Sequence, residues 1–235
     1  MHFDVFNGDA DGIIALVQLR LAEPKVSRLI TGVKRDIDLL KQVDVTTAKS
    51  VTVLDISLEK NNDSLNALLA EKINVFYVDH HRTGIIPNSN HLIAHLDTDA
   101  NICTSLLVDK YLNGRYQNWA IAAAFGDNMT ASAIALSVQA GLSQQQQDNL
   151  ADLGIYINYN GYGRTVDDLH FHPAKLYELL LPYQDPLTLI SEESSVFTDL
   201  ALAYKDDMNK AQSAKVLIEN EQCKVVQLED AAWAR

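Results

Sequence analysis

The first hundred residues alternate between short β-branched runs and segments with helical spacing, and this alternation most limits the fold. Strand-like runs are predicted over residues 3–6, 28–33, 51–54 and 73–78. Between them, apolar residues recur at helical spacing over residues 13–21, 36–42 and 58–71. Such alternation is typical of a parallel sheet that helices cover on both faces. The predicted fold class is therefore α/β, with a parallel sheet of about five strands flanked by helices and a helical C-terminal segment.

From about residue 100 onward the pattern changes to helices alone. Helices are predicted over residues 102–112, 119–125, 131–140, 143–155, 173–181 and 192–220, with a loop around residues 158–172. Ser143 followed by Gln146 fits a capping box, which places the run of glutamines in a first helical turn. We expect an α/β core over residues 1–130 and a helical extension over residues 131–235.

Charge and composition limit the kinds of molecule that the protein is expected to bind. The chain of 235 residues has 19 Lys and Arg against 31 Asp and Glu, a net charge of -12, which opposes binding to long duplex nucleic acid. No apolar run approaches the roughly 20 residues of a membrane span, and the N-terminus lacks a signal-peptide layout. The two cysteines, Cys103 and Cys223, form no CxxC pattern and are predicted to be buried thiols. The expected compartment is the cytoplasm, without membrane contact.

Polar residues follow three of the predicted strands. They are Asn7, Asp9 and Asp11 after the first, Asp55 after the third, and Asp79, His80, His81 and Arg82 after the fourth. Ligands of open parallel sheets bind at the carboxyl ends of the strands, so these side chains are expected to share one crevice.

Each motif also has a structural interpretation. An aspartate before a helix is commonly an N-cap, and a glycine commonly serves a turn. The coincidence of the motifs favours a site, because gathered carboxylates repel one another unless cations are present. With Asp127 of the segment AAAFGDN, four carboxylates would balance two divalent cations. Oxygen ligands with one or two imidazoles suit Mn²⁺, with Mg²⁺ or Co²⁺ as alternatives.

The segments NGDADG, LDIS, VDHH and FGD, in that order, resemble the four motifs of the DHH phosphoesterase superfamily. That superfamily includes single-strand exonucleases, oligoribonucleases, cyclic-dinucleotide phosphodiesterases, exopolyphosphatases and family II pyrophosphatases. The resemblance covers about residues 1–130.

The resemblance implies roles for individual residues. One metal would bind Asp9 and Asp55, and the other would bind Asp11, Asp55, His80 and Asp127, with Asp55 bridging. His81 would face the phosphate as a catalytic residue, and Asp79 would brace the histidine pair. Two such metals would share an activated water and neutralise charge on the phosphorus oxygens.

Two features depart from the family pattern. Many members carry histidine where this chain has Asn7, and an amide oxygen is a weaker ligand for these ions. Active relatives commonly carry a further C-terminal domain that closes over the substrate, and in this chain that domain is expected to be absent or truncated. An open cleft of this kind is compatible with a homodimer.

Substrate contacts are expected from residues outside the metal set. Arg82 is a candidate phosphate clamp or an ordinary surface arginine. Thr104 and Ser105 are candidates for phosphate binding at a helix N-terminus, or ordinary helix residues. Arg164 lies in a glycine- and tyrosine-containing segment that either covers the crevice or forms a surface connection.

The predicted function is metal-dependent hydrolysis of small phosphorylated substrates: short oligonucleotides, nucleotide phosphodiesters or polyphosphate. Two alternatives remain open at the level of sequence. The chain could be a non-catalytic metal- or nucleotide-binding regulatory module, or an inactive fragment of a larger DHH protein. Fold resemblance supports the class of reaction better than it supports a substrate.

Overall fold

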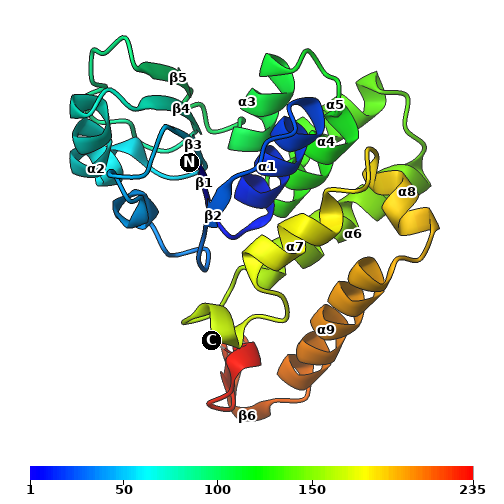
Figure 1. The fold of residues 1–235 in the computed structure, drawn as a ribbon. Helices are drawn as coiled ribbons and strands as arrows, with labels where there is room; N and C mark the ends of the chain where they lie inside the picture. Colours follow the sequence, from blue (N-terminus) through cyan, green and yellow to red (C-terminus); the bar gives the residue numbers. More distant parts are fainter. Residues whose placement is uncertain (235) are drawn as a thin grey trace.

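The computed structural model describes residues 1–234, and its centre is a parallel sheet. The strands are β1 (His2–Phe6), β2 (Arg28–Ile30), β3 (Ser50–Leu54), β4 (Asn74–Asp79) and β5 (Leu92–Leu96). They lie in the order β2-β1-β3-β4-β5 and every pair is parallel (Figure 1). The α/β prediction is confirmed, with β5 in a range that the sequence did not single out.

Alternating strand residues point to two separate cores. On one face of the sheet lie helices α1 (Ala10–Ala22) and α3 (Thr104–Tyr111), and α4 (Gln117–Gly126) packs against both of these helices (Figure 1). On the other face lie η1 (Leu39–Gln42) and α2 (Leu58–Ala70). Phe6 and Leu54 enter the first core, and their neighbours Val5 and Val53 enter the second. Both faces of the central strands are thus covered.

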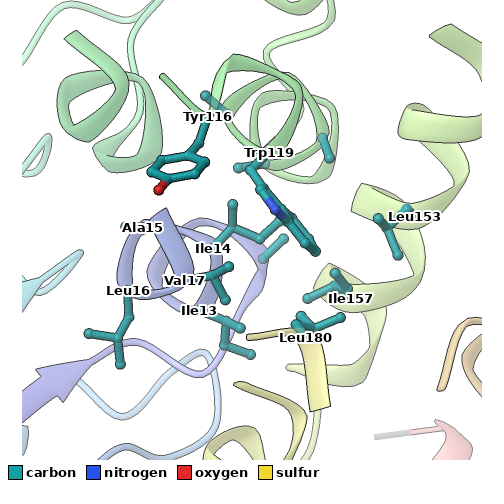
Figure 2. Packing of buried hydrophobic residues seen from close by; sticks show 14 of the residues in the cluster. Ile13, Ile14, Ala15, Leu16, Val17, Tyr116, Trp119, Leu153, Ile157 and Leu180 are labelled. Atoms are coloured by element: carbon teal, nitrogen blue, oxygen red, sulfur yellow. The ribbon is translucent and has the colours of Figure 1, made fainter. Parts of the chain in front are cut away.

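The remaining helices extend the first core. They are α5 (Thr130–Gln139), α6 (Gln144–Asn160), α7 (Pro173–Leu180), α8 (Pro186–Ser191) and α9 (Ser195–Gln212), with η2 (Val166–Asp168) between α6 and α7. Figure 2 shows Trp119 of α4 among side chains of α1, α6 and α7. The capping box at Ser143 is confirmed: its hydroxyl accepts from the Gln146 backbone, and the Gln146 side chain accepts from the Ser143 backbone.

Helices α4 and α6 approach closely through two glycines. A Cβ atom on Gly154 would overlap the Ala122 carbonyl oxygen, and one on Gly126 would lie 2.5 Å from the Gly154 carbonyl oxygen. Larger residues would force the helices apart, so these glycines set the distance between α4 and α6.

The predictions for the C-terminal part and for residues 36–42 need correction. The helix predicted over residues 192–220 begins after the cap Ser194, ends at Gln212, and is followed by a hairpin of β6 (Lys215–Glu219) and β7 (Lys224–Gln227), then η3 (Ala232–Ala234). The β-branched residues of this hairpin favour strands over a helix. Residues 36–42 were predicted as a helix, but only the short 3-10 helix η1 (Leu39–Gln42) forms there.

Cys103 is buried as predicted, but Cys223 is exposed, because the hairpin has no core to cover it. Within residues 1–234, none of the helices combines the length and apolar character that a membrane span requires.

Candidate metal centre

The carboxyl ends of β1, β3 and β4 converge on a cavity of about 140 Å³. Its polar lining includes Asn7, Asp9, Lys34, Asp36, Asp55, Ser57, His80, His81 and Asp127. Asp127 arrives from the C-terminus of α4, on the first-core side of the sheet. Of the residues predicted at three strand ends, the structure therefore brings Asn7, Asp9, Asp55, His80 and His81 together around one cavity.

Asp9 serves two purposes at once. One oxygen, Oδ1, caps α1 by accepting from the backbone N–H groups of Asp11 and Gly12 at 3.0 and 3.1 Å. The other oxygen, Oδ2, lies 2.6 Å from Lys34 Nζ. Burial works to raise the pKa of Asp9, but the attraction of Lys34 lowers that pKa overall. The capping interpretation of the motif and the site interpretation thus apply to different oxygens of one carboxylate.

Asp11 is fully buried and anchored to α3. Its Oδ2 accepts from Thr104 N at 2.7 Å, and its Oδ1 accepts from Ser105 N at 2.6 Å. A helix N-terminus is a favourable place for a carboxylate. These contacts engage the two N–H groups that were expected to bind phosphate, and a substrate role for Thr104 and Ser105 stays a prediction.

Asp55 is buried in the centre of the site and has a left-handed backbone, with φ of 58°. Its Oδ1 accepts from Thr104 Oγ1 at 3.2 Å. Burial raises the pKa of Asp55 well above its ordinary value, and the nearby charges of Asp11 and Asp9 raise it further. A strained backbone and a repelled carboxylate at one position are typical of functional sites.

His80 offers one free ring nitrogen to the carboxylates. Its Nδ1 lies 3.0 Å from the carbonyl oxygen of Ile102, which assigns the proton to Nδ1. Its Nε2 lies 3.4 Å from Asp55 Oδ1, 3.7 Å from Asp127 Oδ2 and 3.8 Å from Asp11 Oδ2. A histidine whose other nitrogen is held by a carbonyl is oriented as metal-binding histidines usually are.

His81 is more open and is held by Asp79. Asp79 Oδ1 lies 2.8 Å from His81 Nδ1, and this hydrogen bond raises the pKa of His81. The side chain of His81 is 45% exposed, whereas Asp79 is fully buried. Nε2 of His81 is thus left for a group that enters from solvent.

Asp127 and Lys34 complete the site. Burial raises the pKa of Asp127 to about 6, and the charges of Asp11 and Asp9 act in the same direction. Lys34 Nζ lies 3.4 Å from Asp127 Oδ1 and 2.9 Å from Asn158 Oδ1 of α6. Lys34 was not among the residues predicted from the sequence. It follows β2, so extending the strand-end rule to the second strand would have found it.

The donor set fits a divalent cation. The buried side-chain acceptors that lack a hydrogen-bond partner in the described part of the chain include Asn7 Oδ1 and Asp79 Oδ2. Two groups, Asp55 with His80 and His81, and Asp11 with His80 and Asp127, each place donor atoms within 4.8 Å of one another. Carboxylate oxygens together with an imidazole nitrogen are a ligand set that suits Mn²⁺.

The two predicted arginines lie outside this cavity. Arg82 is exposed, and its carbonyl oxygen accepts from Ser57 Oγ at 3.0 Å. Arg164 is also exposed, and its backbone N–H donates to Asp168. The same segment nevertheless reaches the site at Gly161, where a Cβ atom would lie 3.2 Å from Asp9 Cα.

Comparison with solved structures finds proteins that share the fold of this chain. A manganese-bound exonuclease RecJ matches with a TM-score of 0.55 over 90% of this chain, at 14% sequence identity. The chain shares its fold with RecJ. The RecJ of Thermus thermophilus, in complex with Mn²⁺, matches with a TM-score of 0.54 over 90% of this chain, at 13% identity.

The match to RecJ concerns only part of each RecJ chain. This chain covers 64% of the first RecJ chain and 36% of the Thermus chain. No protein-family model matches the sequence, and the search of curated proteins gave no match.

Proposed function

We propose that this chain is a metal-dependent phosphoesterase that hydrolyses small phosphorylated substrates. The observation that carries the proposal is the gathering of Asp11, Asp55 and Asp127 around the free Nε2 of His80. Carboxylates so close together need a cation, and burial makes that need stronger. The fold shared with manganese-bound RecJ exonucleases supports the same class of reaction.

The protein side chains divide the work of catalysis. Asp11, Asp55, His80 and Asp127 would hold Mn²⁺, which supplies an activated water and neutralises charge on the phosphoryl oxygens. His81, whose pKa is raised by Asp79, would donate from Nε2 to a phosphate oxygen or to the leaving group. Asp79 would act by orienting His81, because its buried carboxylate holds Nδ1.

The electrostatics of the chain favour a small substrate. A net charge of -12 opposes a long polyanion, so local cations must attract the phosphate. Short oligonucleotides, nucleotide phosphodiesters and polyphosphate all offer a terminal or single phosphate to a small cavity. Arg82 and Arg164 are proposed to contact more distant parts of such a substrate.

Hydrolysis of a substrate panel tests the proposal. The panel would contain bis-p-nitrophenyl phosphate, a dinucleotide, a nucleoside 3′,5′-bisphosphate, pyrophosphate and polyphosphate, each with and without Mn²⁺. Asp55→Asn is the key variant because asparagine tolerates the left-handed backbone at this position. Asp38→Asn, at an exposed surface ion pair, is the matched control.

Turnover that requires both Mn²⁺ and Asp55, and that survives Asp38→Asn, is the expected result. If the protein binds Mn²⁺ but hydrolyses none of the substrates, the result would contradict the phosphoesterase proposal and favour a non-catalytic binding module. Lys34 gives that second candidate some support, because it already neutralises Asp9.

A further inference from the structure

One cation is already built into the carboxylate cluster. Lys34 Nζ lies 2.6 Å from Asp9 Oδ2, 3.4 Å from Asp127 Oδ1 and 2.9 Å from Asn158 Oδ1. The ammonium therefore has three oxygen partners from three elements of the fold. Two of these oxygens belong to carboxylates that were expected to bind metals.

The backbone fixes Lys34 at this point. Its N–H donates to the Gly161 carbonyl oxygen at 2.9 Å, and its carbonyl oxygen accepts from Asn7 Nδ2 at 3.1 Å. The side chain is 27% exposed, and its Nζ lies 5.7 Å from the centre of the Tyr162 ring. A lysine held both at its backbone and at its ammonium differs from a mobile surface lysine.

The histidine on the other side of the site can serve only one ion. Both candidate donor groups include His80, and Nδ1 of His80 is taken by the Ile102 carbonyl oxygen. A single lone pair remains, on Nε2, and a lone pair of imidazole binds one metal. The carboxylates nearest to this nitrogen are those of Asp55, Asp127 and Asp11.

We propose that the Lys34 ammonium stands in place of a second divalent cation, so that the crevice holds one Mn²⁺ beside a fixed lysine. This inference rests on the metal centre of the proposed function. Asp9 is then the partner of Lys34, and Asp11, Asp55, Asp127 and His80 are the partners of Mn²⁺. A second Mn²⁺ at Asp9 would be strongly repelled by an ammonium that shares its carboxylate.

Asn7 is consistent with this division. An amide beside a divalent cation would be a weak ligand, but an amide beside a lysine can fix the lysine backbone without adding charge. Asn7 Nδ2 does so by donating to the Lys34 carbonyl oxygen. The polar atoms around Asp9 are thus arranged for an ammonium, whereas those around His80 are arranged for a metal.

Counting bound Mn²⁺ tests the inference without using activity. Metal-free full-length protein would be titrated with Mn²⁺ alone, with stoichiometry from native mass spectrometry and spectra from electron paramagnetic resonance. The wild type is expected to bind one Mn²⁺ with the spectrum of an isolated ion. Lys34→Ala and Lys34→Met, which remove the ammonium with and without its volume, are expected to bind two ions with a coupled spectrum.

Lys41→Met is the matched control, because Lys41 pairs with Asp38 on the surface and is expected to leave the count at one. Two coupled Mn²⁺ ions in the wild type, an unchanged count in both Lys34 variants, or no Mn²⁺ binding would each overturn the inference. Substrate turnover is a separate readout: a wild type with one bound Mn²⁺ but no hydrolysis would refute the proposed function and leave this inference standing.

Discussion

Asp55 combines a positive φ with a carboxylate that its neighbours repel, and both properties carry a cost in stability. Its φ is 58°, and burial raises its pKa most, followed by the charges of Asp11 and Asp9. Glycine, asparagine and aspartate are the residues that tolerate this backbone best. The repulsion is therefore tolerated for a purpose that asparagine, which has the same shape, could not serve.

Asp55→Asn is expected to increase the free energy of unfolding of the metal-free protein by about 1 kcal/mol, because it removes a buried repulsion while keeping the backbone. Urea denaturation in the presence of EDTA measures this change. In the presence of Mn²⁺ the wild type should be the more stable protein, since the variant loses a metal ligand. A variant that is less stable than the wild type under both conditions would contradict this account of Asp55.

Asp4 gives a pH-dependent prediction far from the metal centre. It is fully buried, accepts from Arg20 Nη2 at 2.6 Å, and receives further hydrogen bonds from His2 and Ser27. Burial works to raise the pKa of Asp4, but these partners hold it well below the ordinary value of 3.8. Because the pKa is lowered in the folded state, this stabilisation is present above pH 3.8 and is lost as the pH falls below it.

Asp4→Asn is expected to cost about 3 kcal/mol near pH 7, because Arg20 is left buried with its partner charge removed. Urea denaturation at several pH values should show that this cost shrinks below pH 4, where the wild type begins to lose the same interaction. A constant difference at every pH would rule out the charged pair as its source.

At the scale of elements, α6 begins at a cap that the sequence identified. Replacing Ser143 with alanine is expected to destabilise the protein by about 1 kcal/mol, because the Gln146 N–H loses its acceptor. Ser143→Asp should retain most of the stability, since aspartate is an equally good N-cap. Thermal denaturation distinguishes the two variants, and equal losses in both would show that the hydroxyl is not acting as a cap.

The contact between α4 and α6 connects packing to the site. Gly154→Ala is expected to destabilise the protein by at least about 1–3 kcal/mol, because the new methyl group overlaps the Ala122 carbonyl oxygen. It should also weaken the contact of Asn158 with Lys34, since both Gly154 and Asn158 lie on α6. Gln145→Ala, on the exposed first turn of the same helix, is the control, and a variant as stable as this control would contradict the close packing.

Elements with a strong periodic pattern could be predicted, and elements decided by distant contacts could not. Strands β1, β3 and β4 are buried on both faces and read as apolar runs that end in polar residues. β5 has exposed positions such as Ile93, and its pairing with β4 decides its structure. Strand β6 falls within the range predicted as a long helix, because its apolar residues do not distinguish the two periods clearly, and β7 lies beyond that range.

At the scale of the molecule, metal binding should stabilise the whole fold. Free Mn²⁺ at a hundred times its dissociation constant adds about 2.7 kcal/mol when only the folded chain binds it. The melting temperature is therefore expected to rise with Mn²⁺ and to return after EDTA, which differential scanning calorimetry would detect. The rise should be absent in His80→Ala, because this variant removes the imidazole nitrogen that lies 3.4 Å from Asp55, 3.7 Å from Asp127 and 3.8 Å from Asp11. A rise in melting temperature of the same size in this variant would show that His80 is not a ligand of the metal.

The arrangement of the whole molecule determines which residues of the site could be predicted from the sequence. Asp9, Asp55 and His80 follow strands of one sheet, so a rule about strand ends brings them together. Lys34 and Asn158 are 124 positions apart, and nothing local indicates that they meet. Their contact depends on how α6 packs against α4, which is a property of the finished fold.

Trp119, which Figure 2 shows among side chains of three other helices, bears on how such a chain can be recombined in evolution. It is fully buried against residues that include Leu153, Ile157 and Leu180. A gene break after residue 130 would leave this tryptophan facing water and would separate Asn158 from Lys34. Residues 1–130, which carry the motifs, are therefore expected to be inherited together with α6 and α7 when genes recombine. The exposed hairpin after Gln212 can be exchanged without opening the core.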